Sequence, residues 1–337
     1  MKNTEPIKME TSDMTRRQFM RQAVMTGTTL GVALAGGAYL WERKHFVPGF
    51  GEREGLSLPS FRVEPNTALP DLAVAHGADR KQVIRAAVDA LGGINRYIQK
   101  GDVVMIKPNV AFDRPPALCA TTHPDALTAI AELCIEAGAK KVIIADNPIN
   151  SPTSCFLKSG LEAVANNLSL SMQYPESSAF QSLKMEGEIL RHWPLFHRPF
   201  EQANKVIGIS PAKDHNLCYG SLTMKNWYGL LGGRRNQFHQ HIHSIISDFA
   251  LMIQPTLMIL DGMSVLMKNG PTGGRLSDVA EMNTVVAGDD MVAMDSYGYV
   301  NLLGRDNLDQ LGYVHKAHDR GLGNKNWQEL KLKEVTI

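Results

Sequence analysis

Closely spaced cysteines are missing from this chain, which has only four cysteines in 337 residues. They are Cys119, Cys134, Cys155 and Cys218, and no two of them form a C-x-x-C pair. Ferredoxin-type clusters and zinc ribbons both draw their ligands from closely spaced cysteines. The spacing therefore argues against an iron–sulfur cluster. It leaves any cofactor unknown, with a divalent metal held by other side chains still open.

An excess of charge of one sign is also missing. The 35 Lys and Arg residues nearly balance the 34 Asp and Glu residues, which gives a formal net charge of +1. A surface that binds duplex nucleic acid normally shows as a basic excess. The composition therefore excludes a generic nucleic-acid binder, while the 44% of hydrophobic residues suffices for a substantial core.

Nucleotide-binding glycine motifs are absent as well. The stretch 270–274 reads GPTGG, which is a flexible loop but neither a Walker loop nor a dinucleotide fingerprint. Internal repeats and low-complexity tracts are also lacking. Nucleotide binding therefore has no support, although backbone amides of such a loop can approach an anion.

The N-terminus carries a pair of arginines ahead of an apolar stretch. Residues 15–21 read TRRQFMR, and residues 23–41 contain no charged side chain. This arrangement closely resembles the twin-arginine (Tat) export signal, and the alternative is a chance arginine pair before a core helix. The resemblance implies that the twin-arginine export machinery carries the folded chain, often with a cofactor already inserted, to the periplasm.

The fate of that signal stays open in the sequence. Residues 33–35, Ala-Leu-Ala, offer a small-x-small cleavage site, whereas the length of the apolar stretch also suits an uncleaved anchor on the outer face of the inner membrane. Contact with a membrane is expected only through this N-terminal helix. In the oxidising compartment that the resemblance implies, two disulfides are feasible but cannot be paired from sequence.

Composition divides the chain into four parts. Residues 1–41 are the signal or anchor, and residues 42–70, which are rich in Gly, Pro and charge, are predicted to be a linker. Residues 71–320 are predicted to form one α/β domain, in which 151–204 is a candidate insertion or small lobe. Residues 321–337 are predicted to be a C-terminal tail.

Short, largely apolar segments predict strands, and the continuous run 103–106 is typical of a strand that is buried on both faces. These segments lie at 72–75, 103–106, 141–145, 168–172, 206–209, 257–260 and 284–287. Apolar residues at helical spacing predict helices at 79–91, 122–137, 161–165, 222–231, 243–253 and 291–303. The alternation of the two patterns predicts an α/β fold with a mostly parallel central sheet, helices on both faces and a right-handed crossover.

Five of the apolar runs end in polar side chains. These are Lys107 with Asn109, Asp146 with Asn147, Lys213 with His215, Asp261, and Asp289 with Asp290. Parallel strands place their carboxyl ends along one edge of a sheet, so we expect these groups to converge on one cleft. Asp and Asn also favour turns and caps, which explains Asp261 and the pair at 289–290 equally well. Lysine has no such turn preference.

The segment 205–235 is the strongest candidate for one wall of that cleft. It holds Lys213, His215, Lys225, Asn226 and Arg234, together with Cys218, which is read as a core or lining residue. We predict catalytic roles for His215, Lys213 and Lys225, and ligand binding by Lys107, Asn109, Asn226, Asp146, Asp261 and Arg234. The lysines would supply charge, and His215 would supply acid–base chemistry because its unperturbed pKa lies near neutrality. The aspartates would orient these groups or hold a divalent metal.

Histidines alternate along 239–243, which reads HQHIH. On a helix, His239 and His243 would stack one turn apart, a spacing that suits two ligands of one metal. A structural or surface role is the stronger interpretation, because the spacing fixes no third ligand. His123, beside Pro124, is either a catalytic base or a helix-entry residue.

The order of these motifs along the chain resembles one known family. Lys107-Pro108-Asn109, His123-Pro124, Gly138-Ala139-Lys140, Lys213-x-His215, Lys225-Asn226, Asp261-Gly262, Gly270-Pro271 and the acidic segment 289–295 look like the family catalogued as domain of unknown function 362. The resemblance covers residues 70–305. It implies little about activity, because the family is named for the absence of an established function. Some members carry an attached ferredoxin-like cysteine cluster, which this chain lacks.

Three functions are compatible with these observations. The leading hypothesis is an exported α/β protein whose cationic cleft binds a small anion, a carboxylate or phosphate, with catalysis on that anion left open. A cofactor-carrying redox or accessory protein is the second hypothesis, motivated by the export route. The third is a non-catalytic binding module, which would bind the same ligands without turnover.

Overall fold

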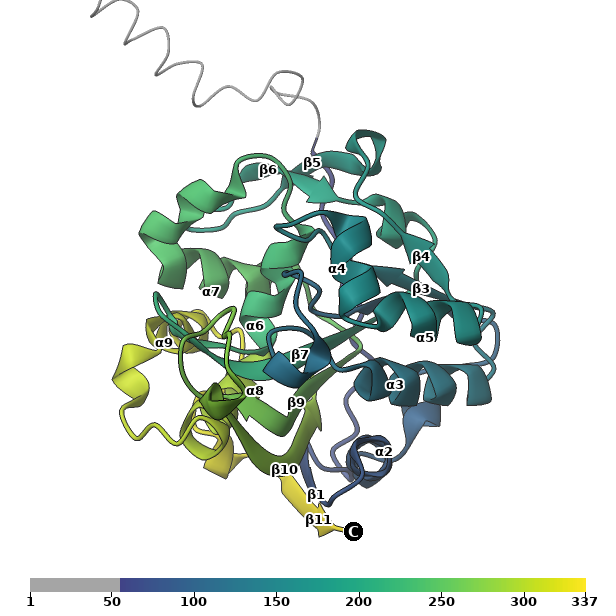
Figure 1. Ribbon diagram of the computed structural model, residues 1–337, viewed down its shortest axis with the longest axis vertical. Coiled ribbons are helices and arrows are strands. Elements are labelled where there is room, and N and C mark those ends of the chain that lie inside the picture. The colour runs from purple at the N-terminus through teal and green to yellow at the C-terminus, as the bar shows by residue number, and fades with distance from the viewer. Residues whose placement is uncertain (1–54) are drawn as a thin grey trace, which may run out of the picture. The chain divides into compact units, whose positions relative to one another are not determined.

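A mixed nine-stranded sheet runs through the computed structural model, which describes residues 55–337 (Figure 1). Its strands lie in the order β11-β1-β10-β9-β7-β2-β3-β4, and β8 pairs with β7 beside this path. In chain order they are β1 (Leu72–His76), β2 (Val103–Lys107), β3 (Lys141–Ala145), β4 (Ser171–Gln173), β7 (Lys205–His215), β8 (Tyr219–Ser221), β9 (Leu257–Leu266), β10 (Val279–Gly288) and β11 (Leu332–Thr336). The predicted export signal and the first part of the predicted linker lie outside the described residues.

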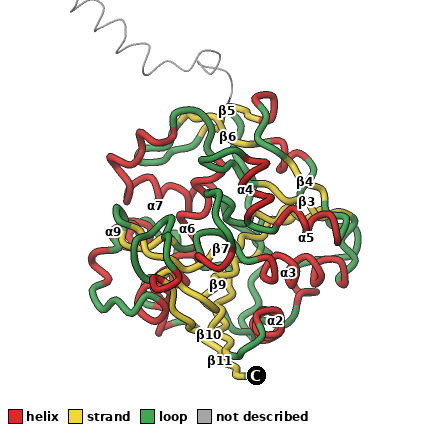
Figure 2. Tube along the Cα trace, viewed as in Figure 1, coloured by secondary structure: helices red, strands yellow, loops and turns green. Residues whose placement is uncertain are grey.

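Helices cover both faces of this sheet (Figures 1 and 2). One face carries α2 (Arg80–Ala90), α3 (Pro124–Glu136), α4 (Pro152–Lys158) and α5 (Leu161–Asn167), and the other carries α6 (Thr223–Asn226), α7 (Ile242–Met252), α8 (Met291–Tyr297) and α9 (Gly312–Asp319). Each face has its own cluster of buried apolar side chains, which explains why the central strands are apolar on both sides. The predicted α/β fold is confirmed.

The strand directions are mostly parallel, with one exception that affects the predicted cleft. β4, β3, β2, β7 and β9 are parallel neighbours, whereas β10 runs antiparallel to both β9 and β1. Residues 267–278 join β9 to β10 without an α-helix, and such direct connections join antiparallel strands. Asp289 and Asp290 therefore follow β10 at the edge of the sheet opposite the ends of β2 and β3. Their predicted place in the cleft is wrong, and Asp290 instead caps α8.

β7 is longer than the apolar run that predicted it. The run 206–209 is followed by Ser-Pro, but the strand continues to His215. Its pairing with β2 stops at Gly208, so Pro211, which has no N–H, falls beyond that ladder. The extended end pairs with β8 instead. Lys213 is thus held on a strand rather than on a loop.

The region 151–204, predicted as a candidate insertion, contains α4, α5, β4 and a separate two-stranded sheet. In this small sheet β5 (Phe180–Lys184) pairs antiparallel with β6 (His192–Phe196). Isolated bridges join β5 to Leu56 and β6 to Leu231. These contacts connect the small sheet to the chain entering the domain and to the segment that follows α6.

Both ends of the described chain pack onto the sheet. Phe61, in the second half of the predicted linker, is buried, and its backbone bonds to Gln254 and Thr256. Residues 321–337, predicted as a tail, contain β11, which pairs in parallel with β1. Among residues 55–337, no helix is long and apolar enough to span a membrane. All four cysteines are buried and free.

Candidate functional site

A cavity of about 190 Å³ lies where β2, β3 and β7 end and α6 begins. Eight of the side chains predicted for the cleft line it: Lys107, Asn109, Asp146, Asn147, Lys213, His215, Lys225 and Asn226. They come from segments that are more than a hundred residues apart in sequence, from Lys107 to Asn226. Parallel strands bring their carboxyl ends to one edge, and this edge is where the cavity lies.

Lys107 and Asp146 form a buried ion pair at the floor of the site. Lys107 Nζ lies 2.8 Å from Asp146 Oδ1, and each side chain is 1% exposed. The ammonium also donates to the Pro108 carbonyl at 2.8 Å and to Asn226 Oδ1 at 3.0 Å. Burial lowers the pKa of Lys107, and the Asp146 carboxylate opposes that change. All three N–H bonds of the ammonium are therefore used inside the protein.

Asp146 is fixed as firmly as its partner. Its Oδ2 accepts from the Val110 N–H at 2.7 Å, and its Oδ1 accepts from the Asn147 N–H at 2.9 Å. Gly229 lies directly over the pair, where a Cβ atom would collide with Asp146 Oδ1 and come within 2.8 Å of Lys107 Nζ. Only glycine allows the backbone to approach this closely.

An amide network links the ion pair to Lys213. Asn226 Oδ1 accepts from Asn109 Nδ2 at 3.2 Å, and Asn109 Oδ1 accepts from Lys213 Nζ at 3.2 Å. Lys213 Nζ also donates to the Ala120 carbonyl at 2.5 Å. Burial, together with the charges of Lys225 and Lys107, lowers the pKa of Lys213 to about 7. Lys213 therefore titrates near neutral pH.

Lys225 differs from Lys107 and Lys213 because its ammonium makes no hydrogen bond or ion pair with another described residue. Among residues 55–337, it has no hydrogen-bond or ion-pair partner, and Nζ lies 5.0 Å from the centre of the Tyr228 ring. Burial lowers the pKa of Lys225. A half-buried cation without a counter-charge is a ready partner for an anionic ligand.

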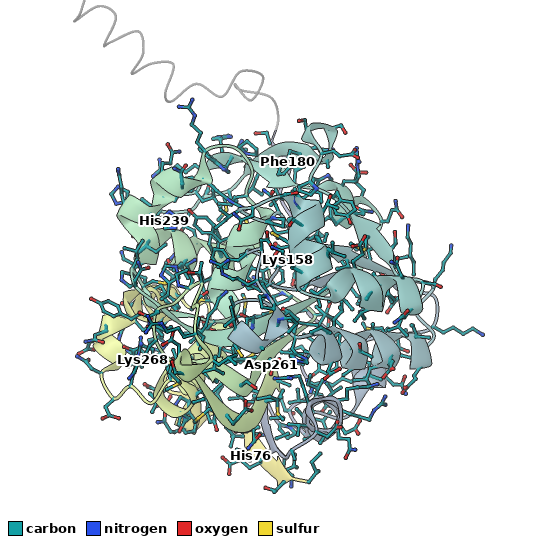
Figure 3. All side chains as sticks on the ribbon, in the orientation of Figure 1. His76, Lys158, Phe180, His239, Asp261 and Lys268 are labelled. Atoms are coloured by element: carbon teal, nitrogen blue, oxygen red, sulfur yellow. The ribbon has the colours of Figure 1, made fainter. Side chains whose placement is uncertain are left out.

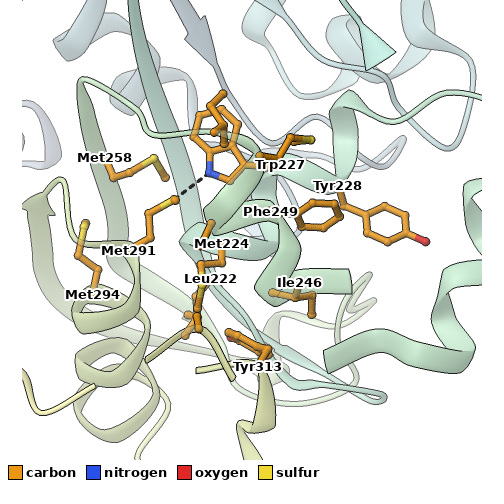
Figure 4. Packing of buried hydrophobic residues seen from close by; sticks show 14 of the residues in the cluster. Leu222, Met224, Trp227, Tyr228, Ile246, Phe249, Met258, Met291, Met294 and Tyr313 are labelled. Atoms are coloured by element: carbon orange, nitrogen blue, oxygen red, sulfur yellow. Dashed lines mark hydrogen bonds between the residues drawn. The ribbon is translucent and has the colours of Figure 1, made fainter. Parts of the chain in front are cut away.

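The position of Lys225 is set by a carboxylate on another helix. Asp295 of α8 accepts from the N–H groups of Thr223 at 2.7 Å and Met224 at 3.2 Å, so it caps α6 in place of Leu222. The fully buried carboxyl has a pKa raised by burial to about 7. Trp227 also packs here, and its Nε1 donates to Met291 Sδ at 2.9 Å (Figure 4).

His215 lines the cavity in a form that the sequence did not predict. Burial and the neighbouring lysines lower its pKa to about 2, so the ring is neutral at physiological pH. Its Nδ1 accepts from the Leu217 N–H at 3.1 Å, which leaves the proton on Nε2. The premise of a pKa near neutrality therefore does not hold, and the imidazole can serve as a hydrogen-bond donor.

Two predicted ligand-binding residues are not brought to the cavity. Asp261 lies inside β9, and its carboxylate pairs with Arg80 Nε at 3.1 Å on the side of α2. Arg234 is exposed, and its neighbour Arg235 lines the cavity instead. The Arg235 guanidinium donates to the carbonyls of Asn147 at 2.6 Å and Leu231 at 3.0 Å. The adjacent arginines predicted a cation at this position. The sequence did not indicate which of the two lines the cavity.

The suggested histidine pair for a metal is not assembled. A 3₁₀ segment, Arg235–His241, contains His239, and α7 begins only at Ile242, so His239 and His243 do not share one helical turn. His239 lines the cavity, whereas His243 stacks between the rings of Tyr219 and Tyr313. Figure 3 places His239 far from Asp261. Within the described part of the chain, no three His, Cys, Asp or Glu side chains are grouped to hold a metal.

Two roles were considered for His123, catalytic base and helix-entry residue, and the structure places it at the entry to a helix. Its Nδ1 accepts from the Asp125 N–H at 3.2 Å, which caps α3.

The aromatic part of the cavity was not predicted from the sequence. Phe112 and Tyr228 line it, and their rings lie 5.2 Å from Lys213 Nζ and 5.0 Å from Lys225 Nζ. No periodicity or motif marked these two aromatic residues.

Comparison with known proteins gives one family and several distant relatives. Residues 104–300 match a family model described as "Domain of unknown function (DUF362)". The "Thylakoid-associated protein sll1697" of Synechocystis is 25% identical over 228 residues, which are 63% of this chain and 66% of that protein.

Two solved structures are also similar. The lactate racemase apoprotein from Thermoanaerobacterium thermosaccharolyticum is 14% identical with a TM-score of 0.38, over 69% of this chain and 56% of that one. A Thermotoga maritima protein is 11% identical with a TM-score of 0.37, over 73% of this chain and 60% of that one. The chain thus spans less than two thirds of either solved protein.

Proposed function

Because the chain belongs to the DUF362 family, whose description names no reaction, we propose its function from the chemistry of the cavity. The cavity binds a small organic anion that carries a carboxylate or a phosphate. The observation that carries this proposal is the charge of the lining. Four basic side chains, Lys107, Lys213, Lys225 and Arg235, line the cavity together with a single carboxylate, Asp146.

Burying cations without counter-charges is costly unless a ligand compensates them. Lys107 is compensated by Asp146, and Arg235 is held by backbone carbonyls. Lys225 has no such partner among the described residues, and Lys213 has only uncharged acceptors. An anion at Lys225, with hydrogen bonds from Asn109 or His215, would supply the missing charge.

Catalysis on this anion is the second part of the proposal. The support is that Lys213, a lysine with a pKa of about 7 whose side chain is buried, lines the same cavity as the anion-binding cation Lys225. A binding module without turnover needs the cations but has no need of a lysine that titrates at neutral pH. A redox accessory role has no comparable support in residues 55–337.

The binding proposal predicts that anions stabilise the protein through Lys225. Phosphate and a panel of small carboxylates should raise the Tm of the wild type, because a ligand that binds only the folded state adds to its stability. In Lys225→Met the same anions should give little or no shift. Differential scanning fluorimetry at constant ionic strength measures both.

Lys268→Met is the matched control, because Lys268 is an exposed lysine outside the cavity (Figure 3). It should respond to anions like the wild type. Equal Tm shifts in Lys225→Met and the wild type would refute anion binding at this cation.

Export is a separate proposal that rests on the sequence of the N-terminus. The arginine pair in 15–21 and the uncharged stretch 23–41 support passage through the twin-arginine machinery, to the periplasm or to an anchored position on the outer face of the inner membrane.

The export proposal predicts that Arg16→Lys with Arg17→Lys retains the protein in the cytoplasm, since an ammonium does not reproduce the guanidinium fork. Cell fractionation with immunodetection measures this. Arg21→Lys is the control and should be exported. Normal export of the double variant would contradict the proposal.

A further inference from the structure

The three lysines of the cavity have three different chemical states. Lys107 is an ammonium with three acceptors, one of them charged, and Lys225 is a cation with no protein acceptor among the described residues. Lys213 is 1% exposed, and it meets only the uncharged oxygens of Ala120 and Asn109. Among residues 55–337 no carboxylate forms an ion pair with it, and the Phe112 ring, 5.2 Å from Nζ, is the contact that favours its charged form.

The two acceptors of Lys213 suit a neutral amine. An ammonium has three N–H bonds, whereas a neutral amine has two N–H bonds and a lone pair. Two donors from Lys213 Nζ satisfy the Ala120 carbonyl and Asn109 Oδ1, and the lone pair then remains unengaged. A desolvated lysine next to other cations is the usual way in which a protein prepares an amine nucleophile.

We propose that Lys213 forms a covalent imine with the carbonyl group of a 2-oxo acid bound in the cavity. This inference rests on the proposed anion binding, because Lys225 would hold the carboxylate while Lys213 attacks the adjacent carbonyl. It adds the substrate class, a small carboxylate that carries a ketone or aldehyde.

The step requires no oxidant or other co-reactant. The lone pair of Lys213 Nζ adds to the carbonyl carbon, and the C=O bonding pair moves to oxygen, which takes a proton released by the nitrogen. The resulting carbinolamine loses its hydroxyl and the second nitrogen proton as water and becomes a C=N imine. Addition of water reverses the sequence, so the adduct is reversible.

Other lining groups are suited to assist the step. The neutral His215 ring keeps its proton on Nε2, a donor for the oxygen that becomes negative during addition. Asn109, whose Oδ1 accepts from Lys213, would hold the amine in place. In the proposal His215 stabilises the developing negative charge, Asn109 is a positioning residue, and the nucleophile is Lys213 alone.

Reductive trapping tests this directly. Full-length protein is incubated at pH 7 with pyruvate, a small 2-oxo acid, and sodium cyanoborohydride, which reduces an iminium to a stable secondary amine. Intact mass and peptide mapping should find one adduct per chain, at Lys213. Labelling there should be on the order of a hundredfold faster than at exposed lysines, because far fewer of those are neutral at pH 7.

Controls separate the covalent step from anion binding. Lys213→Met and Lys213→Arg should lose the adduct, and Lys268→Met should keep it. Lactate, a carboxylate without a carbonyl, should slow labelling of Lys213 by competition. An adduct at Lys225, labelling spread evenly over the lysines, or no adduct at Lys213 would overturn the imine. Anion-induced Tm shifts that persist in that case would leave the binding function standing, whereas absent shifts would remove both.

Discussion

Replacing Asp146 by alanine is expected to destabilise the protein by about 3–5 kcal/mol, because it leaves the Lys107 ammonium buried without its counter-charge. The N–H groups of Val110 and Asn147 also lose their acceptor. Equilibrium unfolding in urea, followed by circular dichroism, measures the loss.

An exposed ion pair provides the control for this effect. Arg85 and Glu136 lie 2.7 Å apart on α2 and α3, with side chains 41% and 54% exposed. Glu136→Ala should cost no more than about 1 kcal/mol, because solvent screens such pairs. Combining Asp146→Ala with Lys107→Met should recover part of the stability, since no charge remains buried. Equal losses in Asp146→Ala and Glu136→Ala would show that burial of the pair has no energetic consequence.

Replacing Lys213 by methionine is expected to raise the free energy of unfolding near neutral pH, with a gain that shrinks as the pH rises. The pKa of Lys213 is lowered from 10.5 to about 7 by folding. Between these two values the unfolded chain binds a proton that the folded chain does not, so wild-type stability increases with pH across this window. Below pH 7 the buried charge costs an amount on the order of 5 kcal/mol, as an upper bound from the shift.

Methionine removes this titration while keeping a similar volume. The difference in unfolding free energy between Lys213→Met and the wild type should therefore be largest at pH 6.5 and smaller at pH 8 and pH 9.5. Denaturant unfolding at the three pH values measures it. Asp295, whose pKa of about 7 is raised by burial, titrates in both proteins and cancels in the difference. A difference that is constant with pH would mean that Lys213 has an ordinary pKa in the folded protein.

The sequence predicted well those parts of the site that depend on buried parallel strands. The interiors of the runs that became β2 and β3, 103–106 and 142–145, contain no charge before Lys107 and Asp146, because both faces of these strands are covered by helices. Their ends were therefore recognisable as functional candidates. The direction of β10 was not predicted, because it depends on the connection 267–278, which contains no α-helix and therefore joins antiparallel strands.

Other predictions of site residues were wrong because they depend on the direction in which a side chain points. The residue type alone does not predict this direction. Asp261 sits inside β9 because Arg80, far away in sequence, neutralises it. Arg235 rather than Arg234 faces the cavity because of the backbone course at the start of a 3₁₀ segment. His239 and His243 are separated by a change of helix type at Ile242. Each of these depends on tertiary packing rather than on local pattern.

The length of β7 has a consequence for the rates at which a ligand enters and leaves. The same strand carries Val206 in the core and Lys213 in the cavity wall, and it pairs with β2 and β9 along the sheet. Such a central strand opens only when the whole domain unfolds. The turn after it also lines the cavity and carries Leu217, which is 47% exposed. Substitutions in this turn should change the association and dissociation rate constants of the ligand together. Substitutions on β7 should change mainly the dissociation rate constant, and hence the affinity.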